Sequence, residues 1–229
     1  MKNGKNTTSN ETKNRIYNSA KILFYKNGYL GTDLKDIAEM ADVPIPLITY
    51  YFKKKILIAA NIYTDFIESA GRKINEYCSK NHIESALLKE MLLSYIIYDI
   101  VLFDERNKRF YMQLKSKNLS FYALDKSAIE TYFYNYIEEY GLTVSKQHAD
   151  IYIKMNSEAR RGFFDYYNEN HLNMEVIEIV NSLCSMIPSI IGISREEIDS
   201  KLFLTQSVIK EIDYSDLCFL AKETDSVNG

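Results

Sequence analysis

The side chains best suited to hold an anion stand together at the end of one short apolar run. Residues 47–52 read Leu-Ile-Thr-Tyr-Tyr-Phe, and three lysines follow at positions 53–55. Lysine ammonium groups bind phosphate through their charge, and the hydroxyls of Thr49 and Tyr50 can donate to a phosphate or to a base edge. The pattern therefore indicates contact with a nucleic acid, with a solvated run of charge as the alternative for the lysines and a purely structural role as the alternative for Tyr50.

The sequence has no residue pattern typical of metal binding, nucleophilic catalysis or redox chemistry. The histidines and cysteines are few and far apart, at His82, His148, His171, Cys78, Cys184 and Cys218. No Cys-x-x-Cys, His-Glu-x-x-His, Gly-x-Ser-x-Gly or glycine-rich phosphate loop occurs. We expect no metal, no cofactor and no catalytic residue, and hence no enzyme, although an enzyme assembled from distant residues stays an open alternative.

Two short helices must position the residues around the lysines. The apolar residues of the first helix recur at helical spacing, at Leu34, Ile37, Ala38 and Ala41. Thr32 precedes them as the expected N-cap, and a break follows at residues 41–43. A short helix, a three-residue turn and a second short helix form the helix-turn-helix plan, whose second helix enters the major groove of DNA.

This stretch resembles the DNA-binding domain of the TetR family of transcriptional regulators. The resemblance covers roughly residues 9–62 and rests on the combination of Gly28-Tyr29, Thr32, Ile37-Ala38, Ala41-x-Val43 and Tyr50-Tyr51-Phe52-Lys53. It implies that the second helix reads DNA and that the helix ends grip the backbone. The DNA-contacting residues are then expected to be Thr32, Leu47, Thr49, Tyr50, Lys53 and Lys55. For Thr32, capping alone is the alternative role.

The turn and the start of the second helix depart from the family pattern. Asp42 stands where the family usually has glycine, which is acceptable because aspartate tolerates the left-handed region. Pro44-Ile45-Pro46 replaces a polar cap, and we expect the helix to begin at Pro46. Direct reading of bases should then rest on few hydrogen bonds, with DNA shape supplying the rest.

Charge is distributed unevenly along the 229 residues. The first 60 residues hold ten Lys and Arg against five Asp and Glu, a net charge of +5, whereas the remainder carries −8. A basic end on an acidic body fits one end that meets phosphate and a body that does not. There is no signal-like N-terminus, and the apolar run at residues 91–103 is too short to cross a bilayer, so we expect a cytoplasmic protein that does not enter a membrane.

The rest of the chain favours an all-α fold. Few glycines and prolines and a helical apolar period predict helices near residues 54–79, 84–104, 107–117, 124–140, 145–167, 174–191, 195–212 and 215–222. We divide the chain into a disordered tail (1–8), a three-helix helix-turn-helix DNA-binding domain (9–53) and a larger helical domain for ligand binding and dimerisation (54–229).

Tyrosine is abundant, with 19 residues and no tryptophan, and aromatic side chains crowd the middle helices. By the family resemblance this region encloses a ligand pocket, for which the candidates are Tyr95, Tyr98, Asp99, Tyr111 and Tyr132. Ordinary core packing is the alternative for each tyrosine. Asp99 is expected to be exposed or salt-bridged, with recognition of a cationic ligand as the second possibility.

Two apolar faces could form a dimer interface or the core of one subunit. One lies on residues 145–167 and contains Ile151 and Met155, and the other lies on residues 174–191 and contains Leu183 and Ile187. Arg160 and Arg161 are expected to be solvated, with interface ion pairing as the alternative.

The resemblance implies a dimeric repressor that binds double-stranded DNA and leaves a palindromic operator when a small-molecule effector binds. The alternative is the same fold acting through a protein partner, with DNA binding weak or lost.

Overall fold

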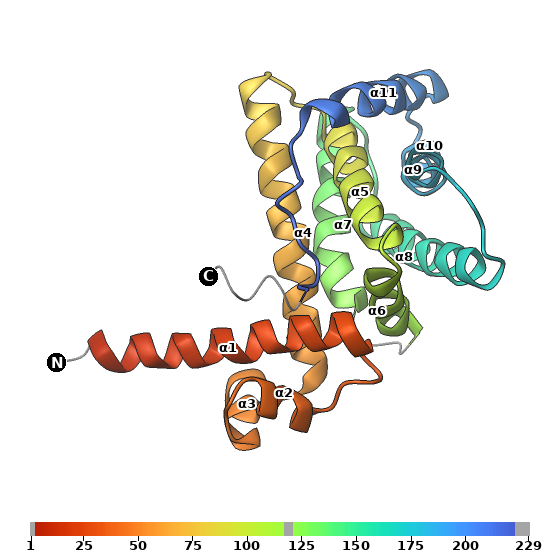
Figure 1. The fold of residues 1–229 in the computed structure, drawn as a ribbon. Coiled ribbons are helices and arrows are strands. Elements are labelled where there is room, and N and C mark those ends of the chain that lie inside the picture. Colours follow the sequence, from red (N-terminus) through yellow and green to blue (C-terminus); the bar gives the residue numbers. More distant parts are fainter. Residues whose placement is uncertain (1–2, 117–120, 223–229) are drawn as a thin grey trace. The chain divides into compact units, whose positions relative to one another are not determined.

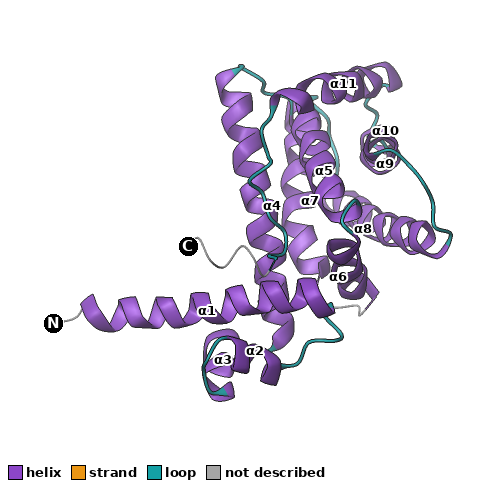
Figure 2. Cartoon of the chain, viewed as in Figure 1, coloured by secondary structure: helices purple, strands orange, loops and turns teal. Residues whose placement is uncertain are grey.

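The computed structural model describes residues 3–116 and 121–222, and within them every regular element is a helix (Figures 1 and 2). In chain order the helices are α1 (Asn3–Asn27), α2 (Leu34–Met40), α3 (Ile45–Phe52), α4 (Lys55–Lys80), α5 (Ala86–Leu102), α6 (Glu105–Ser116), α7 (Phe121–Glu139), α8 (Lys146–Glu169), α9 (Val176–Cys184), α10 (Met186–Ile190), α11 (Arg195–Val208) and the 3-10 helix η1 (Ile209–Glu211). The prediction of an all-α protein is confirmed. Among the described helices, none combines the length and the apolar character that a bilayer span requires.

Two compact units divide the chain differently from the predicted boundary at residue 53. Unit 1 contains residues 1–66, 101–119 and 218–229, and unit 2 contains residues 67–100 and 120–217. Unit 1 therefore holds α1 to α3, the start of α4, α6 and the C-terminal segment.

In unit 1, α1 runs across α2 and α3 (Figure 1). Its buried residues Ile16, Ala20, Leu23 and Phe24 repeat on one face, as an amphipathic helix requires. Gly28 ends the helix with φ +75, the left-handed C′ position predicted for it. The helix begins at Asn3 rather than near residue 9, so residues 3–8, predicted to be a tail, continue α1.

Two predicted helices of the C-terminal half are different in the structure. The helix expected at residues 174–191 is split into α9 and α10, because Pro188 has no N–H to donate to the carbonyl of Cys184. Residues 215–222, predicted to be a short helix, are not helical. The Asp213 carboxylate accepts hydrogen bonds from the amide and the hydroxyl of Ser215, a local pattern that competes with a helix at its predicted start.

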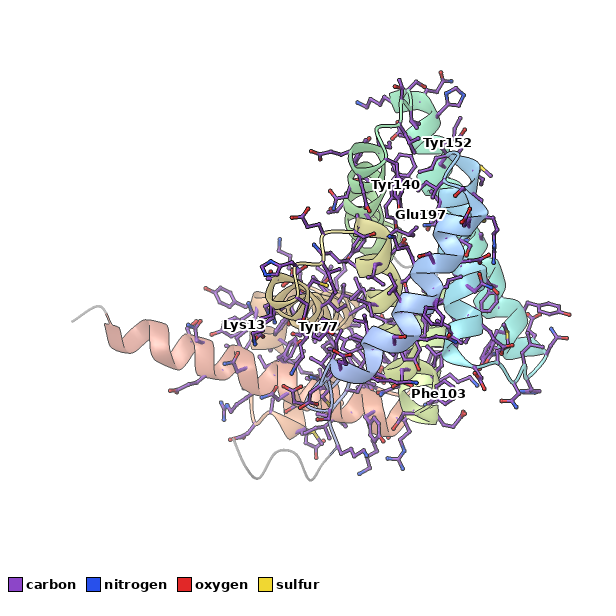
Figure 3. The ribbon with its side chains drawn as sticks, turned by 90° about the horizontal axis from the view of Figure 1, so that it is seen from above. Lys13, Tyr77, Phe103, Tyr140, Tyr152 and Glu197 are labelled. Atoms are coloured by element: carbon purple, nitrogen blue, oxygen red, sulfur yellow. The ribbon has the colours of Figure 1, made fainter. Side chains whose placement is uncertain are left out.

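The core of unit 2 is built from α5, α7, α8, α9 and α10. Phe133, Ala149, Ile153 and Ile187 form one buried cluster at its centre. At its edge Tyr140 donates a hydrogen bond to Glu197 of α11 over 3.0 Å, and the two side chains lie next to each other in Figure 3.

Candidate nucleic-acid interface

The first helix of the helix-turn-helix is capped by Asp33 and not by Thr32. The Asp33 amide donates to the Asp36 carboxylate at 2.7 Å, which pairs the cap with the third helical residue. The Thr32 hydroxyl instead donates to the carbonyl oxygens of Gly28 (2.8 Å) and Leu23 (3.2 Å) at the end of α1. The N-cap prediction was wrong because the end of α1 also needs donors for its last carbonyls, and Thr32 supplies them.

The turn between α2 and α3 has the backbone that the sequence predicted. Asp42 lies at φ +49, in the left-handed region, where a glycine would carry no steric cost. The amide of Val43 then donates to the carbonyl of Ala38 at 3.0 Å, which closes the end of α2. Asp42 therefore adopts the left-handed conformation that the turn needs, in place of glycine.

Helix α3 begins at Ile45 with Pro44 as N-cap, one residue before the predicted start. Neither proline costs a hydrogen bond, because the first-turn amides of a helix have no acceptor within it. Ile48 and Phe52 are buried, whereas Thr49 is exposed and Tyr50 is 77% exposed. Leu47 is half-buried beside them, so α3 buries one face and presents the predicted reading residues on the other.

Tyr51 fixes α3 to α1. Its hydroxyl lies 3.1 Å from Oγ of Ser9, and Lys13 of α1 lies over the ring of the neighbouring Phe52 at 5.8 Å from its centre. These contacts join α3 to α1 through its inner side, and its opposite face is exposed to solvent.

The two lysines predicted to bind phosphate have different environments. Lys53 is exposed at the end of α3, with φ +59, and its amide donates to Thr49. Lys55 is half-buried, and its ammonium donates to the carbonyls of Tyr29 (2.9 Å) and Thr32 while lying 4.4 Å from the centre of the Tyr29 ring. Burial lowers the pKa of Lys55, and Asp33 and Asp36 oppose that shift.

The six predicted contact residues therefore divide into two groups. Thr49, Tyr50 and Lys53 present polar groups to solvent along one face, with Leu47 beside them. Thr32 is fully buried and Lys55 is engaged with backbone carbonyls. Both instead stabilise the junction of α1, α2 and α4.

The five predicted pocket residues do not line one cavity. Tyr111 is buried in unit 1 against Tyr63. In unit 2, Asp99 is half-buried and accepts a hydrogen bond from Tyr214 at 3.0 Å, in place of the expected solvation or salt bridge. Tyr98 is buried and bonded to Arg160, Tyr95 is half-buried on the same helix, and Tyr132 lines an open pocket.

Sequence reasoning missed the strongest polar cluster of unit 2. Arg160, expected at the surface, has a side chain only 13% exposed and pairs with Glu90 at 2.9 Å. Arg161 does stay at the surface, paired with Glu158. One signal was available: Glu90 interrupts the apolar run of α5, where a carboxylate needs a partner. No three His, Cys, Asp or Glu side chains of the described residues converge on a possible metal position.

The arrangement defines a class of protein: a helix-turn-helix unit with an outward recognition helix, joined to a second helical unit. The family model for bacterial regulatory proteins of the tetR family matches residues 16–58, which include α2 and α3. Residues 16–58 therefore carry the DNA-binding segment of the tetR family, as the sequence resemblance predicted. The matched family consists of regulators and not of enzymes.

Two curated relatives carry regulator names. One is the probable HTH-type transcriptional regulator YttP of Bacillus subtilis, 31% identical over 98 residues; the match covers 43% of this chain and only 46% of that relative. The other is the negative transcriptional regulator IcaR of the biofilm operon icaADBC of Staphylococcus aureus. It is 27% identical over 150 residues, which cover 64% of this chain and 74% of the relative.

Solved structures share the fold at low sequence identity. RolR in complex with resorcinol superposes with a TM-score of 0.63 at 12% identity, covering 86% of this chain and 95% of that one. A gamma-butyrolactone receptor superposes with a TM-score of 0.51 at 15% identity, covering 89% and 99%. The similarity extends well beyond the helix-turn-helix and therefore includes the arrangement of helices in the larger domain.

Proposed function

We propose that this protein is a cytoplasmic transcriptional repressor that binds a palindromic operator as a homodimer and leaves it when a small-molecule effector binds. The observation that carries the proposal is the outer face of α3, where Thr49, Tyr50 and Lys53 point to solvent while Ile48 and Phe52 anchor the helix. The relative IcaR is named a negative regulator. RolR was crystallised with a small molecule.

Half-buried Leu47 and exposed Thr49 and Tyr50 offer one apolar and two hydroxyl contacts to base edges. Lys53 supplies a charge for the backbone. Few direct hydrogen bonds are available, so operator choice should depend partly on DNA shape.

A dimer is required because one recognition helix covers only a few base pairs. Two helices of unit 2 carry large exposed apolar side chains: Ile151 and Met155 on α8, each 45% exposed, and Phe203 on α11, 69% exposed. The apolar face predicted on residues 174–191 belongs to the core of the subunit, because Leu183 and Ile187 are buried. We assign the dimer interface to α8 and α11.

The test is a gel shift with the DNA that flanks the protein's own gene, at several salt concentrations. We expect a discrete complex with one segment, competed by the same segment far better than by unrelated DNA. The matched variant Thr49→Ala, which removes an exposed hydroxyl without touching the core, should weaken that preference, whereas Thr143→Ala, an exposed threonine of unit 2, should not. Equal binding of all DNA by the wild type would contradict operator recognition.

A protein partner is the second candidate. Ile45 is 43% exposed and borders an open groove of about 460 Å³ formed by Lys35, Ala38, Glu39, Asp42, Val43, Pro44 and Ile45. Absence of any specific DNA complex, together with a stable protein complex that Ile45→Asp abolishes, would favour this function instead.

A further inference from the structure

Unit 2 buries an ion pair that stability alone does not require. Glu90 of α5 is 7% exposed and accepts from Arg160 of α8 at 2.9 Å. Arg160 also donates to Asn156 (3.3 Å) and to the Tyr98 hydroxyl. Replacing a buried ion pair by apolar residues is often neutral or stabilising, so such a pair is weak evidence for a structural role. The guanidinium is therefore held by Glu90, Asn156 and Tyr98.

A small cavity of about 10 Å³ lies beside this pair, which is room for one water-sized group. Its wall is apolar on one side and polar on the other, formed by Phe133, Ile153, Leu183, Ile187 and Pro188 and by Glu90, Tyr136, Asn156 and Cys184. Tyr136 is 2% exposed, and its buried hydroxyl has no hydrogen-bond partner among the described residues. An unpaired buried hydroxyl is costly, which points to a group that arrives with a ligand.

An open pocket of about 720 Å³ also has residues of α5 and α7 in its wall, as the inner cavity does. Its lining residues are Asn75, Glu84, Ser85, Ala86, Lys89, Thr131, Tyr132, Asn135, Glu138 and Glu139. Lys89 and Tyr132 of this pocket are the chain neighbours of Glu90 and Phe133 in the inner cavity. Tyr132 is half-buried in the wall of the open pocket, and burial together with the nearby charge of Glu90 raises the pKa of its hydroxyl.

We propose that the open pocket and the inner cavity are two parts of one effector site, which takes a small neutral molecule with a ring and a hydroxyl group. The hydroxyl occupies the inner cavity, where it donates to Glu90 and accepts from Tyr136. The ring takes the place of the Tyr132 side chain, which moves into the open pocket. The regulatory meaning of this site rests on the proposed function; the binding itself does not.

The electrostatics of the cavity select a neutral ligand. Above pH 7, where the Glu90 carboxyl is ionised, its charge balances that of Arg160, so an added buried charge would have no counter-ion. A hydroxyl, in contrast, both donates and accepts, and therefore satisfies the Tyr136 hydroxyl and a Glu90 oxygen at once. A ring without a hydroxyl would leave Tyr136 unpaired.

The experiment measures binding of phenol to the whole protein by calorimetry, with benzene and benzoate as probes that lack the neutral hydroxyl. We expect phenol to bind at least about tenfold more tightly than either, because one hydrogen bond in a buried site is worth roughly that factor. Tyr136→Phe should lower phenol affinity about tenfold while leaving the melting temperature unchanged or higher. Tyr134→Phe, on the same helix but with the tyrosine 48% exposed, is the control and should leave affinity unchanged.

Three outcomes would overturn the site: no phenol binding, equal binding of the three probes, or unchanged phenol affinity in Tyr136→Phe. The first would mean that the cavity holds water only. Gel shifts on the same samples separate this result from the proposed function. Specific DNA binding without phenol binding rejects the site alone, whereas phenol binding without specific DNA binding supports the site and rejects the regulator.

Discussion

Lys53 and Lys55, separated by a single residue, show how burial determines the role of a side chain. Lys53 extends into solvent at the end of α3, whereas the Lys55 ammonium is bonded to the carbonyls of Tyr29 and Thr32. A free ammonium can release counter-ions from DNA, but one bonded within the protein must first break its own hydrogen bonds. The sequence treats the two as equal candidates, and the structure separates them.

Replacing Lys53 by Ala should reduce the slope of log affinity against log salt by about two for a dimer, because each phosphate contact contributes about one. The measurement is operator binding by fluorescence anisotropy between low and moderate salt. Lys146→Ala, an exposed lysine of unit 2, is the control and should leave the slope unchanged. An unaltered slope in Lys53→Ala would remove this residue from the interface.

Lys55→Met should act on stability and not on the salt slope. It leaves the carbonyls of Tyr29 and Thr32 without their donor, which costs about 1–3 kcal/mol of unfolding free energy. Urea unfolding measures that loss, and Lys53→Met is the matched control, expected to be near neutral. If Lys55→Met unfolds like the wild type but shows a smaller slope of log affinity against log salt, Lys55 contacts DNA.

Glu90 should make stability depend on pH. Burial raises the pKa of its carboxyl to about 7, against the opposing charge of Arg160, from an ordinary value of 4.5. Between these two pKa values the unfolded chain has released the proton while the folded protein keeps it. The free energy of unfolding therefore falls as the pH rises to about 7. Above that pH the contribution of Glu90 no longer changes.

Relative to Glu90→Gln, the wild type should therefore lose about 3 kcal/mol of unfolding free energy between pH 4.5 and 7. Urea unfolding of both proteins across that range measures the difference. Glu169→Gln, which changes an exposed carboxylate, should show no comparable trend. A parallel pH dependence of wild type and Glu90→Gln would mean that Glu90 is ionised throughout.

At the scale of elements, the C-terminal segment is part of the DNA-binding unit. Phe219 is fully buried, with its ring centre 5.0 Å from that of Phe66 in α4 and 5.5 Å from that of Phe110 in α6. Lys21 of α1 donates to the carbonyl of Cys218 at 3.3 Å. The last described residues of the chain therefore complete the core that supports the helix-turn-helix.

Phe219→Ala should lower the unfolding free energy by about 3–5 kcal/mol, because it removes a large buried ring and leaves a cavity. Thermal or urea unfolding measures the loss. Phe103→Ala, which truncates a phenylalanine of the same unit that is 63% exposed, should change stability by about 0.5 kcal/mol or less. Equal effects of the two substitutions would show that Phe219 is not a core residue.

At the scale of the whole molecule, the proposed function requires assembly into a dimer. A symmetric dimer places two recognition helices about 34–36 Å apart on one face of DNA. Large exposed apolar side chains on a monomer mark interaction surfaces, and those of α8 and α11 belong to the same compact unit.

Ile151→Asp combined with Phe203→Asp should convert a dimer into a monomer, because each buried carboxylate would lack a partner. Light scattering after size exclusion measures the mass, and operator affinity should fall with it. Phe103→Asp introduces the same charge at an exposed phenylalanine of unit 1 and should leave the dimer intact. A dimeric double variant would assign the interface to other helices.

The sequence by itself determined the local features: the two short helices, the left-handed turn at Asp42 and the helix end at Gly28. These depend on residues that are close together in the chain, and so does the family pattern. Only the tertiary structure decided which side chains are exposed and which are buried or paired. Glu90 meets Arg160 across 70 residues, Phe219 enters the core of the N-terminal unit, and Thr32 and Lys55 turn inward while Lys53 stays in solvent. Contacts between distant residues, and the burial that results from them, produce no regular spacing along the sequence. They therefore could not be predicted from a sequence pattern.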